Sequence, residues 1–447
     1  MERFIGIVIA LLALGIMMTI HELGHFLVGR KLGFKITEFM IFWGPRLWSR
    51  VRNGIRYSLR LIPIGAAVSF AGGELSAAED EDQVITEEGI DYDPRDPGLF
   101  VNRPKRYRAA VLAAGSVANI ISGILIYFFL FLGRGYVVPV IGAVPEDTQA
   151  AAAGLQPGAR IEMLGGVRVR TDIDAAYADA LAPADAALAI RVRQPDGSRL
   201  ETVLEPATRM VRRLGITTDR SEPVIRVLAV ESWQNDGSPV FQVDDEILAI
   251  GGEKVTQESF AGILMQQPEG VFTVRVRRGG EEITVETVTR QVETQTDRGL
   301  VLTRSQNRLG AFPYALQYGW SVITGSLRAI GGLFTGALQP RETLSGPIAI
   351  VDMMSTVVAQ PGIDWGEKAI DLVTLVAIIS LSLGFTNLLP IPLLDGNHLL
   401  LLLIEAIRGR RLPRRVIQIV SISGVIIIAA IFFYGIYLDV SRIVLRG

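Results

Sequence analysis

Four long apolar runs interrupt the chain, at residues 4–28, 109–132, 371–389 and 416–438. A helix rises about 1.5 Å per residue, so about 20 apolar residues cross the ~30 Å hydrocarbon core of a membrane. Each run is about that long, which predicts four transmembrane helices. The first run stands where a signal peptide would, but no small-residue cleavage site follows it, so we favour a transmembrane helix.

Basic residues are concentrated in the loops that border these runs. They are Arg30, Lys31 and Lys35 after the first run, Arg103, Lys105, Arg106 and Arg108 before the second, and Arg408, Arg410, Arg411, Arg414 and Arg415 before the fourth. Cytoplasmic loops carry an excess of Lys and Arg, so these loops are expected in the cytoplasm. Both termini and the segment 133–367 are then expected outside, in the periplasm of a bacterium with an inner and an outer membrane.

The outer segment contains an internal repeat. Residues 154–169 align without gaps on 240–255, and each copy leads into an alternating pattern typical of β-strands. Two small α/β domains are therefore expected, at 137–210 and 222–292. The first copy resembles a PDZ domain in Ala153, Gly154, Leu155, Pro157, Gly158 and Ile161.

The second copy lacks the Ala-Gly-Leu element, so its resemblance to a PDZ domain depends mostly on the repeat. PDZ domains capture extended chains by adding a strand to an exposed sheet edge. The alternative is that one or both copies are steric plugs with an empty groove.

The remaining segments complete an α-helical polytopic membrane protein with a membrane-associated β element and two periplasmic PDZ-like domains. We divide them into a first transmembrane segment at 1–34, a β element at 35–73, an acidic cytoplasmic loop at 74–108, transmembrane segments at 109–133, 366–404 and 416–440, and a membrane-surface segment at 310–350. The apolar stretch 314–338 is interpreted as an amphipathic surface helix, because a fifth span would move a basic loop outside. The stretch 57–70 is either an amphipathic surface hairpin or a β element that re-enters the membrane.

Composition narrows the possible chemistry. The 447 residues are 49% hydrophobic and carry a formal net charge of −2, so the chain is not basic enough to suggest a nucleic-acid partner. There is no cysteine. A bound metal must therefore be held by histidine and carboxylate.

The first apolar run ends on "HELGH" at 21–25. His21 and His25 are four residues apart, so on a helix they share one face and can bind one zinc ion, with Glu22 beside them as a general base. The alternative is a pair of hydrogen-bonded core histidines. Ionisable residues inside a membrane span are costly and usually functional, which favours the metal site.

A catalytic zinc normally takes three protein ligands, so one more is needed. The stretch 387–400, "NLLPIPLLDGNHLL", places Asp395 in an apolar run after two prolines that break the helix. Unwound backbone at membrane depth is tolerated where it is buried in protein or lines a cavity. Spacing favours Asp395 as the third ligand, with His398 as the alternative.

These motifs together resemble the site-2 protease family of intramembrane metalloproteases. The resemblance rests on "HELGH", "NLLPIPLLDG", the PDZ-like pair and the four apolar runs. Two further segments support it, "AAGSVAN" at 113–119 and "LSGPIAI" at 344–350. Ser116 and Asn397 depart from the family pattern, and neither is a predicted metal ligand.

The resemblance implies the roles of individual residues. It implies the zinc ligands His21, His25 and Asp395, with Glu22 activating the water. It also implies that Asn387, Pro390 and Pro392 help to hold the substrate near the metal. The stretch 57–70 would offer an edge strand to a substrate that must be unwound before cleavage.

The function that follows is an intramembrane zinc endopeptidase of the stress-response type. Its expected substrate is a single-span membrane protein such as an anti-sigma factor already trimmed outside, and the PDZ pair would act as a size filter. The active site is expected near the cytoplasmic end of the first span. The alternative is a membrane-anchored PDZ scaffold or chaperone with a structural metal, but such a metal does not need Glu22 as a base. The substrate's identity and the oligomeric state stay open.

Overall fold

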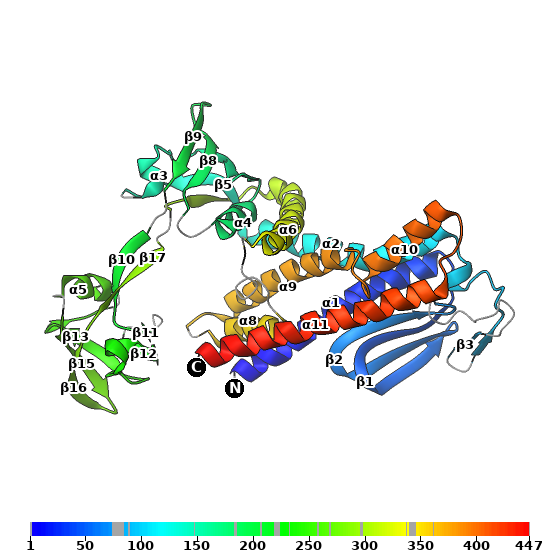
Figure 1. Cartoon of the computed structure of the whole chain (residues 1–447), viewed down its shortest axis with the longest axis horizontal. Coiled ribbons are helices and arrows are strands. Elements are labelled where there is room, and N and C mark those ends of the chain that lie inside the picture. The colour runs from blue at the N-terminus through cyan, green and yellow to red at the C-terminus, as the bar shows by residue number, and fades with distance from the viewer. Residues whose placement is uncertain are drawn as a thin grey trace.

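The computed structural model describes residues 2–73, 85–87, 90–146, 148–182, 186–205, 208–218, 224–231, 233–256, 259–267, 270–295, 298–336, 338, 346–360 and 362–446. Figure 1 shows a bundle of long helices with a curved sheet beside it, and two smaller β-rich units away from that sheet. Both chain ends lie at the same end of the bundle (Figure 1).

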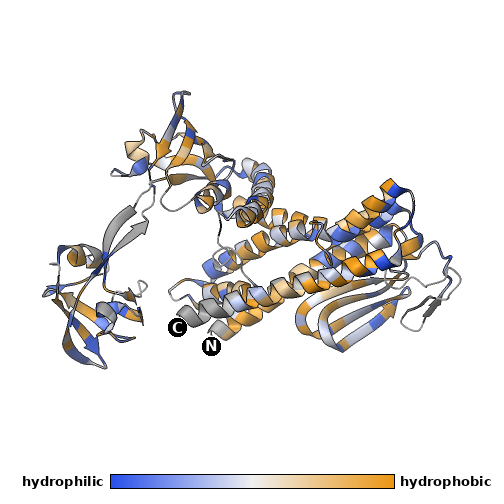
Figure 2. Ribbon diagram, in the orientation of Figure 1, coloured by the Kyte–Doolittle hydropathy of each residue, from blue (hydrophilic) through white to orange (hydrophobic). Residues whose placement is uncertain are grey.

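Three helices in the described part of the chain are long and apolar enough to cross a membrane. They are α1 (Glu2–Lys31), α2 (Lys105–Arg134) and α9 (Trp365–Asn387). Figure 2 shows hydrophobic residues along most of their length. The fourth predicted run lies in α11 (Arg414–Arg446), a helix of 33 residues whose described apolar part covers Arg415–Ile426. A fourth membrane span therefore stays a prediction.

The helix α2 forms the centre of the bundle, because α1, α6, α9 and α10 all pack against it. Glycines allow two of these approaches. A Cβ atom at Gly24 of α1 would lie 2.4 Å from the carbonyl oxygen of Ala114, and one at Gly384 of α9 would lie 2.7 Å from that of Ser116. Small residues favour such packing inside a membrane, where close van der Waals contact holds helices together.

The curved sheet beside the bundle consists of β1 (Ile36–Arg52) and β2 (Ile55–Phe70). Residues 38–41 of β1 pair with 66–69 of β2 on one side and with 56–59 on the other. The outer part of β1 pairs with the start of β2. Two bent strands thus make a sheet four segments wide, with the end of β2 at one edge. A short hairpin, β3 (Ile85–Glu87) and β4 (Ile90–Tyr92), and the 3-10 turn η1 (Phe100–Asn102) follow before α2.

The two β-rich units have the same strand order. The first contains α3 (Gln149–Ala152), α4 (Asp172–Leu181), β5 (Tyr136–Ala143), β6 (Arg160–Leu164), β7 (Val167–Arg168), β8 (Leu188–Arg193) and β9 (Arg199–Leu204). The second contains α5 (Phe260–Gln266), η2 (Gln234–Gly237), β11 (Ile216–Thr218), β12 (Ile225–Val230), β13 (Glu246–Ile250), β14 (Glu253–Lys254), β15 (Phe272–Arg278) and β16 (Glu281–Thr287). The orders are β18-β5-β6-β8-β9 and β11-β12-β13-β15-β16. In addition, β7 pairs with β6 in the first sheet, and β14 pairs with β13 in the second.

The second unit is inserted into the first. The strand β18 (Val301–Ser305) completes the first sheet by pairing with β5, although it follows the second unit in the chain. A two-stranded ribbon of β10 (Thr208–Arg213) and β17 (Arg290–Gln295) leads out and back. The ranges 137–210 and 222–292 expected from sequence therefore leave out β18 and β11. A repeat pattern does not reveal which strand closes each sheet.

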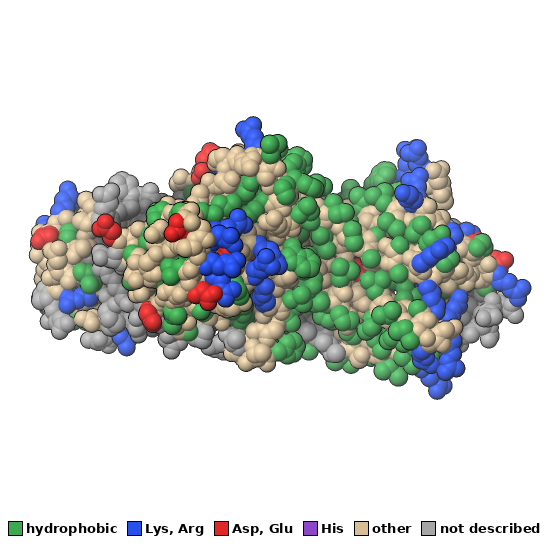
Figure 3. All heavy atoms as spheres, turned by 90° about the horizontal axis from the view of Figure 1, so that it is seen from above, with side chains coloured by type: hydrophobic (Ala, Val, Ile, Leu, Met, Phe, Trp, Pro, Cys, Tyr) green, Lys and Arg blue, Asp and Glu red, His purple; other side chains and the backbone are tan. Residues whose placement is uncertain are grey.

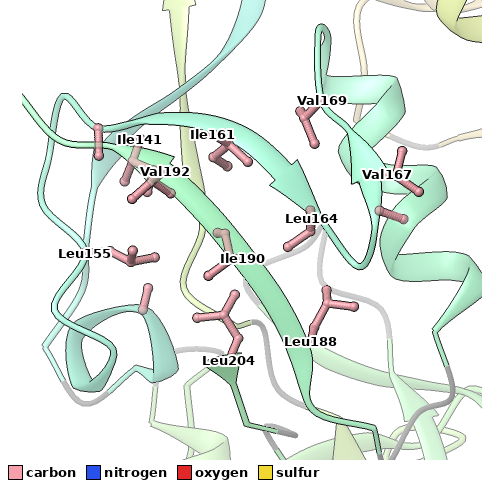
Figure 4. Close-up of a cluster of buried hydrophobic side chains, with 13 residues drawn as sticks. Ile141, Leu155, Ile161, Leu164, Val167, Val169, Leu188, Ile190, Val192 and Leu204 are labelled. Carbon is pink, nitrogen blue, oxygen red and sulfur yellow. The ribbon is translucent and has the colours of Figure 1, made fainter. Parts of the chain in front are cut away.

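Alternation of apolar and polar residues explains the core of each unit. In β8 the side chains of Leu188, Ile190 and Val192 are buried, and those between them are less so. Figure 4 shows these three and Ile161 pointing into one cluster. A corresponding cluster surrounds Val274 in the second unit.

The helix α6 connects the first unit to the bundle. After the turn η3 (Arg308–Gly310), α6 (Ala311–Thr335) packs against α2 and α9 and also against α4. It covers most of the stretch 314–338, where an amphipathic helix is predicted. Two shorter helices follow, α8 (Pro347–Ala359), which packs on α1, and α10 (Asp395–Arg408), which packs on α2.

Candidate active site

The helix α1 presents three ligand-type side chains within the apolar bundle. His21 and His25 lie one helical turn apart, and their Nε2 atoms are 3.1 Å from each other. Both residues are buried, with 8% and 7% of their surface exposed. A carboxylate oxygen of Glu22 lies within 4.8 Å of a nitrogen of each histidine. The arrangement expected from the spacing in "HELGH" is therefore present.

Asp395 reaches the same place from the far end of the chain. The turn between α9 and α10 is tight: Leu393 adopts a φ of 73°, in the region that favours glycine. A Cβ atom at Gly396 would lie 2.2 Å from the carbonyl oxygen of Leu389, so this position requires glycine. Because α10 begins at Asp395, the carboxylate stands at the end of the turn, against α1.

The three side chains converge on one point. The Asp395 Oδ2 atom lies 3.0 Å from His21 Nε2 and 3.4 Å from His25 Nε2, and it is buried without a hydrogen-bond donor among the described residues. Zinc binds such nitrogen and oxygen atoms at about 2.0–2.2 Å, which places the ligands of a tetrahedral site about 3.3 Å apart. The observed separations, together with the orphaned oxygen, fit a zinc ion.

The ring of His25 is held in one tautomer. Its Nδ1 atom lies 2.7 Å from the carbonyl oxygen of Val111 in α2. A carbonyl oxygen only accepts, so Nδ1 carries the proton and donates it. The lone pair of the neutral ring is then on Nε2, directed at Asp395 and available to a metal.

Two asparagines approach the other ring nitrogen of His21. The Nδ2 atoms of Asn119 and Asn387 lie 3.5 and 3.4 Å from His21 Nδ1. Asn119 is fully buried, and its Oδ1 atom has no donor among the described residues. Turning the Asn119 amide by half a rotation places Oδ1 against Nδ1, where it can accept the proton of a ring whose Nε2 faces a metal.

Gly115 of α2 leaves the space that the site needs. A Cβ atom there would lie 2.4 Å from His25 Nε2 and 2.7 Å from His21 Nε2. Any larger residue would therefore occupy the position between the two histidine nitrogens. Gly115 and Asn119 belong to the stretch "AAGSVAN", but no role at the metal site was expected for them. In the sequence, the feature that could have indicated such a role is a glycine and an asparagine within an apolar run.

Glu22 contacts the edge of the curved sheet. The backbone N–H of Val68 in β2 donates to Glu22 Oε2 at 3.0 Å. Val68 pairs with Phe39 of β1 on its other side, so its N–H points away from the sheet. The edge of β2 therefore faces the same point as the metal-type ligands.

The remaining predicted residues lie at the end of α9, in the turn that follows it and in the first turn of α10. Asn387 is the last residue of α9 and is half-buried. Pro390 and Pro392 lie in the turn that leads to Asp395, and Pro390 is exposed. His398, the alternative third ligand, lies three residues after Asp395 in α10.

Comparison with known proteins identifies the family. The chain matches Peptidase family M50 over residues 9–431. It is 29% identical to the regulator of sigma-E protease RseP of Salmonella typhimurium strain 14028s over 464 residues, which covers 97% of this chain and 98% of that protein. It is 26% identical to RseP of Escherichia coli K12 over 466 residues, with the same coverage. A Vibrio cholerae protein named as a zinc metalloprotease is 27% identical over 466 residues, also with 97% and 98% coverage.

The match extends over nearly all of the chain, including α1 with its histidines and α10 with Asp395. The long apolar helices and the added sheets fit a membrane protease with β-rich units. This chain therefore belongs to peptidase family M50, the site-2 protease family, and is a zinc metalloprotease.

Proposed function

We propose that this protein is an intramembrane endopeptidase that cuts the transmembrane segment of single-span regulatory proteins. The observation that carries the proposal is the convergence of His21, His25 and Asp395 inside a bundle of apolar helices, with Glu22 beside them. A peptide bond within a lipid bilayer is the substrate that a site at this depth would meet.

His21, His25 and Asp395 would hold the zinc ion through Nε2, Nε2 and Oδ2. When bound, zinc would lower the pKa of its water to about 7 and polarise the carbonyl under attack. The hydrogen bond from His25 Nδ1 to the Val111 carbonyl orients that ring and keeps its proton on Nδ1. The Asn119 amide, turned so that its Oδ1 accepts from His21 Nδ1, would do the same for His21.

Glu22 would act as the general base and then as the general acid. Its Oε2 atom accepts the Val68 N–H, which orients the carboxylate and leaves Oε1 to accept the proton of the attacking water. The same oxygen would then deliver this proton to the amine nitrogen of the leaving peptide. A structural zinc site would need no such group, so Glu22 favours the enzyme over the scaffold.

The edge of β2 at residues 66–70 would bind the unwound substrate. Its outward N–H and C=O groups can pair with an extended chain, which keeps the substrate backbone hydrogen-bonded inside the membrane. The Val68 contact supports this, since it joins that edge to the general base. Asn387 would bind the substrate backbone near the metal, because Asn119 already serves His21, and Pro390 and Pro392 would line the same side.

We further propose four membrane spans, with the termini and both β-rich units in the periplasm of a bacterial inner membrane. Arg30 and Lys31 end α1 after the histidines, so the active site would lie near the cytoplasmic side. The two β-rich units are interpreted as PDZ domains that admit only a substrate with a short periplasmic stub, such as a trimmed anti-sigma factor. The names of the relatives, regulators of sigma-E protease, support this substrate class.

Cleavage of a single-span reporter tests the proposal. The reporter carries a short outer stub and is mixed in detergent with the native protein or with Glu22→Gln, each with and without a zinc chelator. The proposal predicts a product cut within the apolar segment, which disappears with either the substitution or the chelator. A product that survives Glu22→Gln would contradict the role of this residue.

A further inference from the structure

A basic cavity of about 970 Å³ lies between the sheet of the first β-rich unit and α6. Six arginines line it. They are Arg160, Arg168, Arg170, Arg191, Arg193 and Arg199. None of its lining residues comes from α1 or α10, the helices that carry His21, His25 and Asp395.

The described carboxylates do not neutralise this cluster. Glu162 pairs with Arg193 at 2.8 Å and with Arg199 at 3.4 Å, and Glu201 pairs with Arg191 at 2.5 Å. The guanidinium groups of the other three, on β6 and around β7, form no ion pair with a carboxylate of the described residues. The cavity therefore keeps a net positive charge.

The register of the sheet places arginines opposite one another, which does not help the sheet to fold. Arg160 pairs directly with Arg193, and Arg193 pairs directly with Arg199. Like charges opposite each other on neighbouring strands destabilise a sheet. Glu162 bridges Arg193 and Arg199, but no described carboxylate forms an ion pair with Arg160, so a ligand of opposite charge would compensate the Arg160–Arg193 pair.

In the second β-rich unit the corresponding cross-strand positions carry opposite charges. Because residues 154–169 align on 240–255, Glu246 stands where the first unit has Arg160. Glu246 pairs across the sheet with Arg277 and forms an ion pair with it at 3.1 Å. One copy thus carries an opposite-charge pair where the copy beside α6 carries two arginines.

The other wall of the cavity belongs to α6 and is mostly apolar, with Gln317 as its polar member. Leu316 and Trp320 line it and are 46% and 56% exposed, and Phe312 continues their stripe one turn earlier. Phe312 also contacts Phe128 of the transmembrane helix α2, so the stripe joins the surface that would face lipid. In Figure 3 a group of Lys and Arg side chains borders the wide hydrophobic surface in the middle of the view.

We propose that this cavity binds the phosphate-bearing headgroup of an anionic phospholipid, with the acyl chains along the α6 stripe. Arginine binds phosphate through paired N–H groups, and tryptophan favours the membrane interface. A peptide that adds to a sheet edge is a poorer fit, because the arginines stand on the face of the sheet. The bound lipid would hold the first β-rich unit against the membrane. This inference rests on the proposed transmembrane placement of α1, α2 and α9.

The test uses the full-length protein in nanodiscs of phosphatidylcholine that contain a photoactivatable phosphatidylglycerol. Arg160→Glu gives the first unit the residue that the second unit has at this position, so its sheet should fold. Each basic residue near an anionic surface strengthens binding about five-fold. Arg160→Glu removes one positive charge and adds one negative charge, so labelling of this variant should fall more than about ten-fold. Arg275→Glu on the exposed face of β15 is the matched control and should label normally. Arg168→Ala serves as a second variant and should lower labelling about five-fold.

Three results would overturn the inference. One is equal labelling of the native protein, Arg160→Glu and Arg168→Ala. Another is equal labelling by a photoactivatable phosphatidylcholine, which would show contact without headgroup selection. The third is loss of labelling on adding inorganic phosphate or an acidic peptide at matched ionic strength, which would assign the cavity to a soluble anion or a protein segment. Glu22→Gln should label like the native protein, so a failure of the proposed proteolysis would leave this result unchanged.

Discussion

The Oδ2 atom of Asp395 lies 3.0 Å from the Nε2 atom of His21, although the two residues come from near opposite ends of the chain. The contact depends on two separate features. The helix α2 holds α1 in place and orients its histidines, while the turn before α10 delivers the carboxylate. Each feature can be changed without altering His21, His25 or Asp395.

Gly115→Ala should abolish zinc binding and proteolysis. The added methyl would lie 2.4 Å from His25 Nε2, where it displaces the ring from the metal. Gly133→Ala is the matched control on the same helix, because nothing lies within 4 Å of a Cβ there. Metal analysis of the two purified variants checks the prediction. A full complement of zinc in Gly115→Ala would contradict the position inferred for the ion.

Asn119→Ala should weaken zinc binding by about 10–100-fold, the usual effect of removing a hydrogen-bond partner of a metal-bound histidine. The measurement is zinc retention against a series of chelator concentrations. Asn387→Ala should retain zinc like the native protein and lose cleavage instead, because we assign it to the substrate. If the two variants exchanged these effects, the roles of the two asparagines would be reversed.

Asp245→Asn should destabilise the second β-rich unit by about 1.5–3 kcal/mol, because a neutral amide replaces the charged acceptor of the half-buried Arg278 guanidinium. Arg278 donates to both oxygens of the buried Asp245, at 2.8 and 2.7 Å. Burial alone would raise the pKa of Asp245, but these bonds and the Gln242 N–H outweigh it and lower the pKa below its ordinary value.

A lowered pKa in the folded state fixes the pH dependence. The stabilisation is complete above the unfolded pKa, about 3.9, and is lost as the pH falls through the lower folded value. The protection of the β13 and β15 amides, taken relative to the intrinsic exchange rate at each pH, should therefore fall in acid in the native protein. In Asp245→Asn exchange should be fast at neutral pH already. Equal protection of both proteins at neutral pH would show that this ion pair is unimportant.

Removal of the second β-rich unit should relax substrate selection without stopping cleavage. Arg213 and Arg290 pair at the end of the β10–β17 ribbon, so a short turn can join them in place of residues 214–289. The shortened protein should cut the reporter with a short stub at the native rate. If the unit is a size filter, the protein should also begin to cut a reporter with a folded outer domain. Unchanged rejection of that reporter would argue against the filter.

Much of the helical part could be predicted from sequence, because apolar length and charge asymmetry are local properties. The position of His21 and His25 on one face of α1 follows from helical spacing alone. Spacing favours Asp395 over His398 only modestly, because the turn geometry at Leu393 and Gly396 decides where the carboxylate lies. The distances from Asp395 Oδ2 to both histidine Nε2 atoms support Asp395.

Long-range pairing could not be predicted. The repeat revealed two similar units, but not that β18 closes the first sheet after the second unit has been inserted. The doubled pairing of residues 38–41 within the curved sheet was equally hidden, because strand bends depend on contacts across the sheet. The role of Asn119 was not predicted, because it depends on the contact of Asn119 with His21, which is distant in the chain.

The most direct test of the central claim compares Asp395→Ala with His398→Ala for bound zinc and reporter cleavage in the same preparations. The account predicts about one zinc per chain and normal cleavage in the native protein and in His398→Ala, with neither in Asp395→Ala. Zinc and cleavage that persist in Asp395→Ala and disappear in His398→Ala would contradict it and assign the third ligand to His398.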